Sequence, residues 1–385
     1  MSRSQTLSLG QSNRALAYRP QVDGLRFIAV FSVLFYHYSN WLRKLDLPFT
    51  IEMGTFISFF FVLSSYLITT ILLKDKHRGD SLGATAYTFL VRRTLRIFPA
   101  YYFYLLLLLL LPYGGLDVRE HPLPYFFYVS NFHTWASQYW DSLTAHLWTL
   151  SVEEQFYIFW LWVVLLVPSR LLPNVLYLLI VSGITFRLLF CWLQPGTANE
   201  TVPMVILTPS CIDSFAWGGL LAWRHFYKKS DMIPLLKKIF PAILGVWIGL
   251  ILLHQRVLLV GFDRAFMSIG SLILIDSAVK GSTSRFGVFL QHKWITWLGK
   301  ISYGIYLYHL LLPYVFWKVY NQLAASLQQK HGWSLEPLTI VLVNPVVSLL
   351  LYCTLTILFA AASWYFLEQP FNRLKRYFRY AVVAR

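Results

Sequence analysis

The sequence predicts an all-α fold, a polytopic membrane helix bundle of about ten transmembrane helices with both termini in the cytoplasm. Three observations support this prediction: the composition, the number of long apolar segments, and the distribution of lysine and arginine. Apolar residues make up 57% of the 385 positions and charged residues 13%, and the mean hydropathy is +0.54. A soluble domain has about 45–50% apolar and 25% charged residues. The core of a soluble protein of this size would not hold this apolar surplus.

A helix needs about 20 largely apolar residues to cross a bilayer, and about ten segments of the chain meet that criterion. The sixth departs most from the pattern because two prolines stand at its start and an aspartate lies inside it, and the last is long enough to tilt or protrude. The predicted spans lie roughly at 25–42, 55–73, 94–112, 147–167, 172–193, 204–223, 240–258, 262–279, 294–315 and 339–367.

We expect residues 1–385 to form a single membrane domain, with a polar lead at 1–20 and a basic tail at 371–385. The lead has no apolar core followed by a cleavage site, so the first span itself should direct insertion. The three cysteines are scattered through apolar segments, which predicts core packing and neither a disulfide framework nor a metal site.

Lysine and arginine residues are distributed unevenly between the two sides of the predicted bundle. The termini and the four loops that share their side carry 23 of the 33 basic residues, the opposite loops carry 7, and the other three lie at or within spans. The positive-inside rule then places both termini in the cytoplasm. Topology and contact with anionic membrane lipids thus account for the net charge of +16, with no need for a nucleic-acid partner. We expect a multi-pass protein of a bacterial cytoplasmic (inner) membrane.

Ionisable side chains within a bilayer are costly and tend to face the bundle interior. In the first span Arg26 lies at the cytoplasmic mouth, and His37 lies eleven residues on, about 16 Å along the helix. His37 is either an interior histidine bonded to a neighbouring helix or a functional group, and mid-membrane placement favours function. Asp23 lies three residues before Arg26, so these two residues are also placed to pair on one helical face.

The third span begins with two arginines, Arg93 and Arg96, that share a helical face. Together with Arg26 they would suit a polyanionic cofactor, because guanidinium groups bind phosphate in a bidentate manner. The alternative for both residues is positive-inside anchoring.

The fourth and ninth spans also contain polar residues. His146, Glu153 and Gln155 fall near the outer edge of the fourth span, where one of two adjacent glutamates should face inward. Further candidates, each equally compatible with a structural role, are Asp213 in the sixth span and Ser302, Tyr303 and His309 in the ninth.

With these residues identified, the chain resembles the acyltransferase-3 family of integral membrane O-acyltransferases, the O-antigen and Nod-factor acetylase type. RPQVDGLRFIAV followed by His37 is similar to the first-span motif, and FFVLSSYLIT, which contains Ser64, to the second, with Ser65 in place of the usual glycine. RRTLRIFPAYY and HLWTLSVEEQFY are similar to the next two motifs, and LGKISYGIYLYH and FLEQPFNRLKR to the last two. Cys211 stands where many members have an arginine two residues before Asp213.

The resemblance implies an acyl-CoA donor, usually acetyl-CoA, and a hydroxyl of a cell-surface or lipid-linked carbohydrate as acceptor, with no permanently bound cofactor. Arg26, Arg93 and Arg96 would hold the nucleotide and pyrophosphate of CoA. His37 would remove the acceptor proton, and Glu153 would orient the imidazole or balance its charge. Direct transfer is preferred, and an acyl-histidine intermediate stays open.

A polytopic transporter or flippase of a sugar or lipid-linked substrate is the alternative, although the chain shows no repeated half. The aromatic connection at 113–146 would stack on sugar rings or anchor the protein at the interface.

Overall fold

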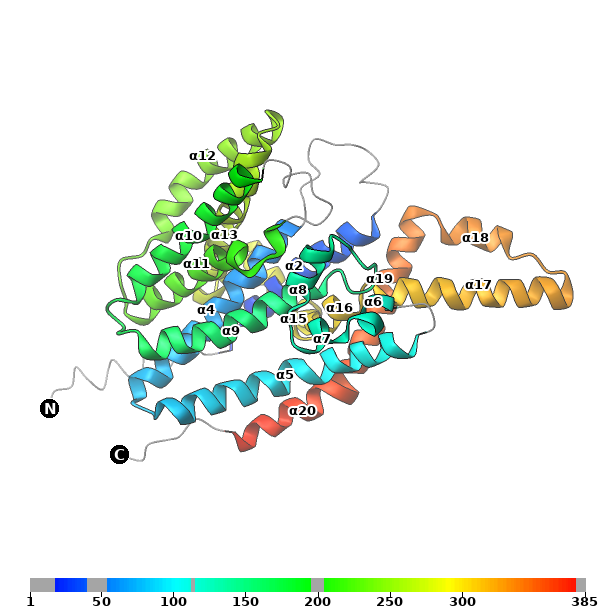
Figure 1. Cartoon of the computed structure of the whole chain (residues 1–385), viewed down its shortest axis with the longest axis horizontal. Coiled ribbons are helices and arrows are strands. Elements are labelled where there is room, and N and C mark those ends of the chain that lie inside the picture. Colours follow the sequence, from blue (N-terminus) through cyan, green and yellow to red (C-terminus); the bar gives the residue numbers. More distant parts are fainter. Residues whose placement is uncertain (1–17, 40–53, 112–114, 195–203, 379–385) are drawn as a thin grey trace.

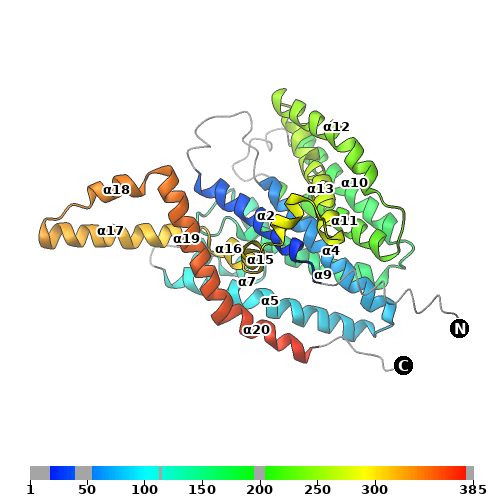
Figure 2. The same cartoon turned by 180° about the vertical axis from the view of Figure 1, so that it is seen from behind.

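The computed structural model describes residues 18–39, 54–111, 115–194 and 204–378, with side chains from residue 57 in the second range. Every regular element in these ranges is helical, which confirms the all-α prediction. The long helices pack side by side into one bundle (Figure 1, Figure 2). The first half contains α2 (Pro20–Tyr38), α4 (Gly54–Arg78), α5 (Leu82–Leu110), α6 (Leu116–Glu120), α7 (Pro122–Phe126), α8 (Ser130–Ser137), α9 (Leu147–Leu166) and α10 (Leu172–Leu193). The second half contains η3 (Met204–Ile206), α11 (Thr208–Phe226), α12 (Ile233–Leu252), α13 (Arg256–Lys280), α14 (Arg285–Leu290), α15 (Lys293–Lys300), α16 (Ser302–Tyr308), α17 (Leu311–His331), α18 (Glu336–Leu342), α19 (Pro345–Ser363), the π-helical turn η4 (Trp364–Glu368), α20 (Gln369–Arg373) and η5 (Leu374–Tyr377).

Seven helices among the described residues are long and apolar enough to cross a membrane. They are α4, α5, α9, α10, α12, α13 and the helix that begins with α19. The other predicted spans correspond to α2 and α11, which are more polar, and to the region at 294–315. The count of ten therefore stays a prediction. The end of the first predicted span, most of the polar lead and the last residues of the basic tail lie outside the described residues.

The region at 294–315 is not one continuous span, contrary to the prediction. It consists of α15, α16 and the start of α17, with breaks at Ile301 and at His309–Leu310. Helix α15 packs closely on α2: a Cβ added at Gly299 would lie 1.9 Å from the Asp23 carbonyl oxygen. Beyond the second break, α17 and α18 form an arm that projects from the bundle (Figure 1).

Helix α5 begins twelve residues before the predicted start of the third span, so Arg93 and Arg96 lie well inside a helix. Its N-terminus is capped by Ser81, whose Oγ accepts a hydrogen bond from the backbone N–H of Ala84 at 3.2 Å. The prediction from hydropathy missed these first turns because they are less apolar than a span.

The loops between helices and the C-terminal tail that are predicted to share one side of the membrane are in contact with one another. Lys76 donates to the Val164 carbonyl at the end of α9 at 2.8 Å, and Arg92 donates to the Lys375 carbonyl at 3.0 Å. Lys280 pairs with Asp231 at 2.6 Å. These contacts agree with the predicted alternation of the helices, while the assignment of this side to the cytoplasm stays a prediction.

Helices α4, α9 and α11 meet in an aromatic core that supports the site described next. Phe215 stacks on Phe156 and Phe61, with ring centroids 3.9 Å and 4.6 Å apart. At Gly218 the backbones of α11 and α4 approach so closely that an added Cβ would lie 2.0 Å from the Val62 carbonyl oxygen.

Candidate active site

Helix α2 carries two of the predicted functional residues on one face. Eleven residues complete about three helical turns plus 20°, so Arg26 and His37 project in similar directions, about 16 Å apart along the axis. Arg26 pairs with Asp23 at 2.9 Å, as the spacing predicted. Arg26 also lines a cavity, whereas the His37 ring contacts the His309 ring at a centroid distance of 4.9 Å. The two ends of α2 therefore serve two neighbouring parts of one site.

The first part is a cavity of about 340 Å³ that is lined by three arginines, one glutamate and mostly apolar side chains. Its charged lining comprises Arg26, Arg93, Arg96 and Glu153, so cations outnumber carboxylates. The rest of the lining is mainly apolar, with a few polar side chains: Ile57, Phe60, Phe61, Leu63, Ser64, Leu67, Ile68, Ile71, Ile97, Thr149, Leu150, Tyr157, Ser302, Tyr303 and Tyr306.

Glu153 is held in the cavity wall by two hydroxyl groups. Ser64 Oγ donates to Glu153 Oε1 at 3.1 Å, and Tyr157 OH donates to Oε2 at 2.8 Å. The Arg93 guanidinium lies over the Tyr157 ring, 3.7 Å from its centroid. Among the described residues, Arg93 Nε has no hydrogen-bond partner. The arginine is thus positioned by stacking and retains a free N–H group for a ligand.

The second part is a cluster of three histidines from different elements. The His309 ring lies between those of His37 and His146, with centroid distances of 4.9 Å to each. His309 Nδ1 donates to the Tyr306 carbonyl at 2.5 Å, and His146 Nε2 donates to the Leu307 carbonyl at 2.9 Å. Because a carbonyl only accepts, each bond assigns the proton to that nitrogen and leaves the other nitrogen as an acceptor.

Those remaining nitrogens, His309 Nε2 and His146 Nδ1, are buried and have no hydrogen-bond partner in the described part of the chain. A buried polar atom without a partner is costly, so such atoms are concentrated where a substrate or water is to be met. These two nitrogens are therefore available to accept a hydrogen bond from a ligand or a water molecule.

Tyr306 separates the cavity from the histidine cluster. Its side chain lines the cavity, and its ring lies 5.5 Å from those of both His146 and His309. Its hydroxyl lies 2.7 Å from Thr149 Oγ1 and donates a hydrogen bond to the His146 carbonyl at 3.1 Å. Tyr306 therefore contacts both parts of the site.

Other predicted residues have structural partners. Gln155 donates to the Tyr128 carbonyl at 2.7 Å and to Asn131 Oδ1 at 2.9 Å, which ties α9 to the preceding connection. Asp213 forms a fully buried ion pair with Arg187 at 2.6 Å and does not line the cavity. Ser302 and Tyr303 do line it, and Tyr303 OH donates to the Ile97 carbonyl at 3.0 Å.

Glu368, matched by the last motif, is buried and accepts a hydrogen bond from Ser363 Oγ at 3.2 Å. Its carboxylate oxygen would lie 3.2 Å from a Cβ added at Gly304 of α16. Glu368 therefore supports the short helix that leads to His309.

Sequence reasoning did not single out Tyr157, Thr149 or Tyr306. Tyr157 follows Glu153 by four residues, a spacing that places the two side chains together on a helix, and this signal was present in the sequence. The contacts of Tyr306 with Thr149 and His146 join two helices far apart in the chain, so spacing in the sequence does not reveal them.

The chain is similar in sequence to known acyltransferases. A family model described as an acyltransferase domain matches residues 19–365. The peptidoglycan O-acetyltransferase OatA of Listeria monocytogenes is 30% identical over 76% of this chain and 49% of its own length. A putative O-acetyltransferase of Staphylococcus aureus is 29% identical over 94% of this chain and 58% of its own length, and the O-acetyltransferase OatA of the same species is 29% identical over 76% and 50%. The chain thus spans about half the length of these curated relatives. No solved structure matches.

Proposed function

The chain belongs to the acyltransferase-3 family of membrane proteins, and from this premise we propose that it transfers an acyl group from acyl-CoA to a hydroxyl of an envelope carbohydrate. The donor is acetyl-CoA in this proposal, because the relatives are named as O-acetyltransferases. Two of them are named OatA, one explicitly a peptidoglycan O-acetyltransferase, which supports a cell-wall glycan as the acceptor. A transporter is not favoured, since the family match is to acyltransferases.

The observation that carries the proposal is a cavity that combines three arginines with a largely apolar lining. Three arginines and one glutamate leave an excess of positive charge where the phosphates of CoA would bind. The apolar walls suit the pantetheine arm, which would extend past Tyr306 toward the histidine cluster. In a cytoplasmic membrane, with the arginines on the inner side, such a donor site would lie next to the cytoplasmic pool of acyl-CoA.

In the proposed transfer, the acceptor hydroxyl oxygen attacks the thioester carbonyl carbon while His37 takes the hydroxyl proton. The tetrahedral intermediate then collapses with cleavage of the C–S bond, and the CoA thiolate leaves and takes up the proton that His37 holds. His309 Nε2 and His146 Nδ1 would accept hydrogen bonds from groups at the transfer site. Glu153, bonded to Ser64 and Tyr157, would keep a carboxylate close to the arginines.

The test is transfer of labelled acetyl groups from acetyl-CoA to cell-wall glycan by membranes that contain the full chain. We expect His37→Ala to reduce the transfer rate by about 10²- to 10⁴-fold, the usual contribution of a general base. His292→Ala, which removes an exposed histidine, should retain full transfer. Equal transfer by the His37→Ala variant and the wild type would refute the assignment of the base.

A further inference from the structure

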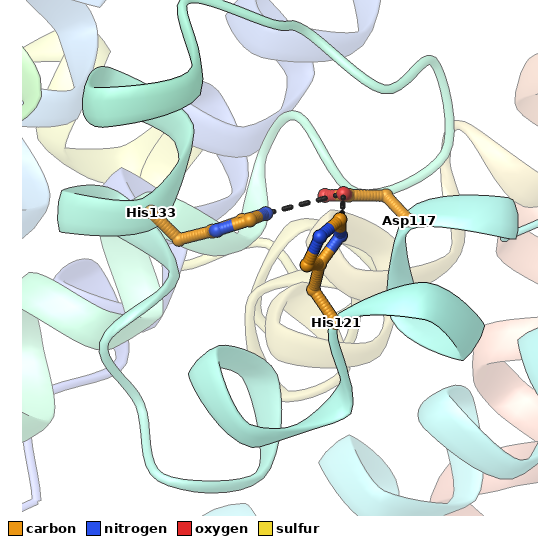
Figure 3. Close-up of side chains that lie close together, drawn as sticks. All are labelled: Asp117, His121 and His133. Carbon is orange, nitrogen blue, oxygen red and sulfur yellow. Dashed lines mark hydrogen bonds and ion pairs between the residues drawn. The ribbon is translucent and has the colours of Figure 1, made fainter.

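The connection between α5 and α9 contains a cluster of one aspartate and two histidines (Figure 3). Asp117 lies on α6, His121 directly follows α6, and His133 lies on α8. Asp117 Oδ1 is 3.2 Å from His121 Nδ1 and 3.1 Å from His133 Nε2, and the three candidate ligand atoms lie within 4.8 Å of one another.

The donor set, and the two distances from Asp117 Oδ1 to the histidine nitrogens, match a transition-metal site. Zn²⁺ binds histidine nitrogen and carboxylate oxygen at about 2.0–2.2 Å, so neighbouring ligands of a tetrahedral ion lie about 3.3 Å apart. Both distances from Asp117 Oδ1 to the histidine nitrogens agree with this ligand-to-ligand distance. Two histidines and one carboxylate also leave a fourth position open, as in catalytic zinc sites and the facial triads of other metals.

Surrounding groups hold the carboxylate in place. Asp117 is buried, and its second oxygen accepts a hydrogen bond from Tyr125 OH. Tyr125 OH lies 3.0 Å from the Oγ1 atom of Thr144. Thr144 precedes His146 by two residues in the chain. Metal-binding carboxylates are usually oriented by such outer hydrogen bonds.

A hydrogen bond alone would explain why His133 lies next to Asp117, because the His133 side chain is only 17% exposed. It accounts less well for His121, whose side chain is 53% exposed. An exposed imidazole gains little from a carboxylate in water. His121 nevertheless contacts the same Asp117 oxygen, Oδ1, as His133 does. This shared oxygen points to an ion bound by all three residues.

We propose that Asp117, His121 and His133 bind a divalent transition-metal ion, with Zn²⁺ as the best match to the two nitrogens and one oxygen. The ion ties α6 to α8 and, through Tyr125 and Thr144, secures the connection that leads to His146. The sequence analysis predicted no metal site, because these residues are neither cysteines nor closely spaced histidines. This proposal does not depend on the acyltransferase activity.

The experiment uses the full chain purified in detergent, treated with a chelator and titrated with Zn²⁺. We expect saturable binding of one ion per chain by calorimetry and elemental analysis, and a rise in the melting temperature. His121→Ala should weaken Zn²⁺ binding by at least about tenfold, because even the loss of a group that only orients a metal ligand has an effect of this size. Because His121 is exposed, the metal-free variant should melt at the same temperature as the metal-free wild type.

His331→Ala, which removes an exposed histidine at the end of α17, is the matched control and should bind Zn²⁺ like the wild type. His121→Cys supplies a thiolate at the same position and should retain binding, with a sulfur-to-metal absorption band when Co²⁺ replaces Zn²⁺. Absence of one-to-one binding, or equal Zn²⁺ affinity of the wild type and His121→Ala, would overturn the proposal.

Discussion

Arg187 and Arg93 both lie inside this bundle, and they differ in how many of their N–H groups already have a hydrogen-bond partner. All five N–H groups of Arg187 are bonded: to both oxygens of Asp213, to the Gly261 carbonyl and to the Ser210 carbonyl. Arg93 stacks on Tyr157 and retains an unpartnered Nε, in a cavity where arginines outnumber carboxylates.

The difference separates structure from function within one membrane domain. A saturated, fully buried arginine has no donor left for a ligand, so Arg187 and Asp213 hold α10, α11 and α13 together. An arginine that lines a cavity with free donors remains able to bind an anion. The burial of a charge therefore says less about its role than the number of partners it already has.

The largest effect is expected from breaking the saturated pair. Arg187→Met leaves the Asp213 carboxylate buried and unpaired, which should destabilise the protein by about 3–5 kcal/mol. The measurement is the melting temperature and yield of the full chain in detergent. The double variant Arg187→Met/Asp213→Leu should recover much of the loss. A stable single variant that has lost only acetyl-CoA binding would place Arg187 in the site instead.

A smaller effect, on binding rather than stability, is expected at the cavity. Arg93→Ala should raise the KM for acetyl-CoA by about 10- to 100-fold, since a charge-assisted hydrogen bond contributes about 1.5–3 kcal/mol. Arg93→Lys should recover only part of this loss because it lacks the planar fork.

Arg92→Ala is the matched control for the cavity. Arg92 neighbours Arg93 on α5 but donates to the Lys375 and Phe378 carbonyls and does not line the cavity, so its loss should leave the KM unchanged. Equal changes in KM for the two variants would mean that general positive charge, and not the cavity, attracts the donor.

The smallest effect is expected at an ion pair outside both regions. The hydrogen bond from Lys280 lowers the pKa of Asp231 below its ordinary value of 3.8. The stabilisation is then present above pH 3.8 and is lost as pH falls through the lowered pKa. Because the Asp231 side chain is 44% exposed, Asp231→Asn should cost less than about 1 kcal/mol near neutral pH, measured by thermal unfolding. A larger loss would mean that this connection is held more tightly than its exposure indicates.

Much of the site was accessible from local sequence rules. The spacing of Asp23 and Arg26 predicted their ion pair, and the placement of His37 and Glu153 inside apolar segments marked them as candidates. Local rules work here because an α-helix converts sequence spacing directly into direction and height.

Other features depend on contacts between residues far apart in the chain. The pairing of Arg187 with Asp213, the approach of His309 to His37, and the convergence of His133 on Asp117 each join different elements. Hydropathy also merged α15, α16 and the start of α17 into one span, because it measures apolar content and not helix continuity.

By itself the sequence determined that this chain is a helical membrane protein with costly charges in its spans, because composition and helical periodicity are local properties. Only the tertiary structure decided which of those charges are saturated by partners and which remain available in a cavity. That distinction depends on the packing of helices against one another, which fixes how many donors and acceptors each buried group meets.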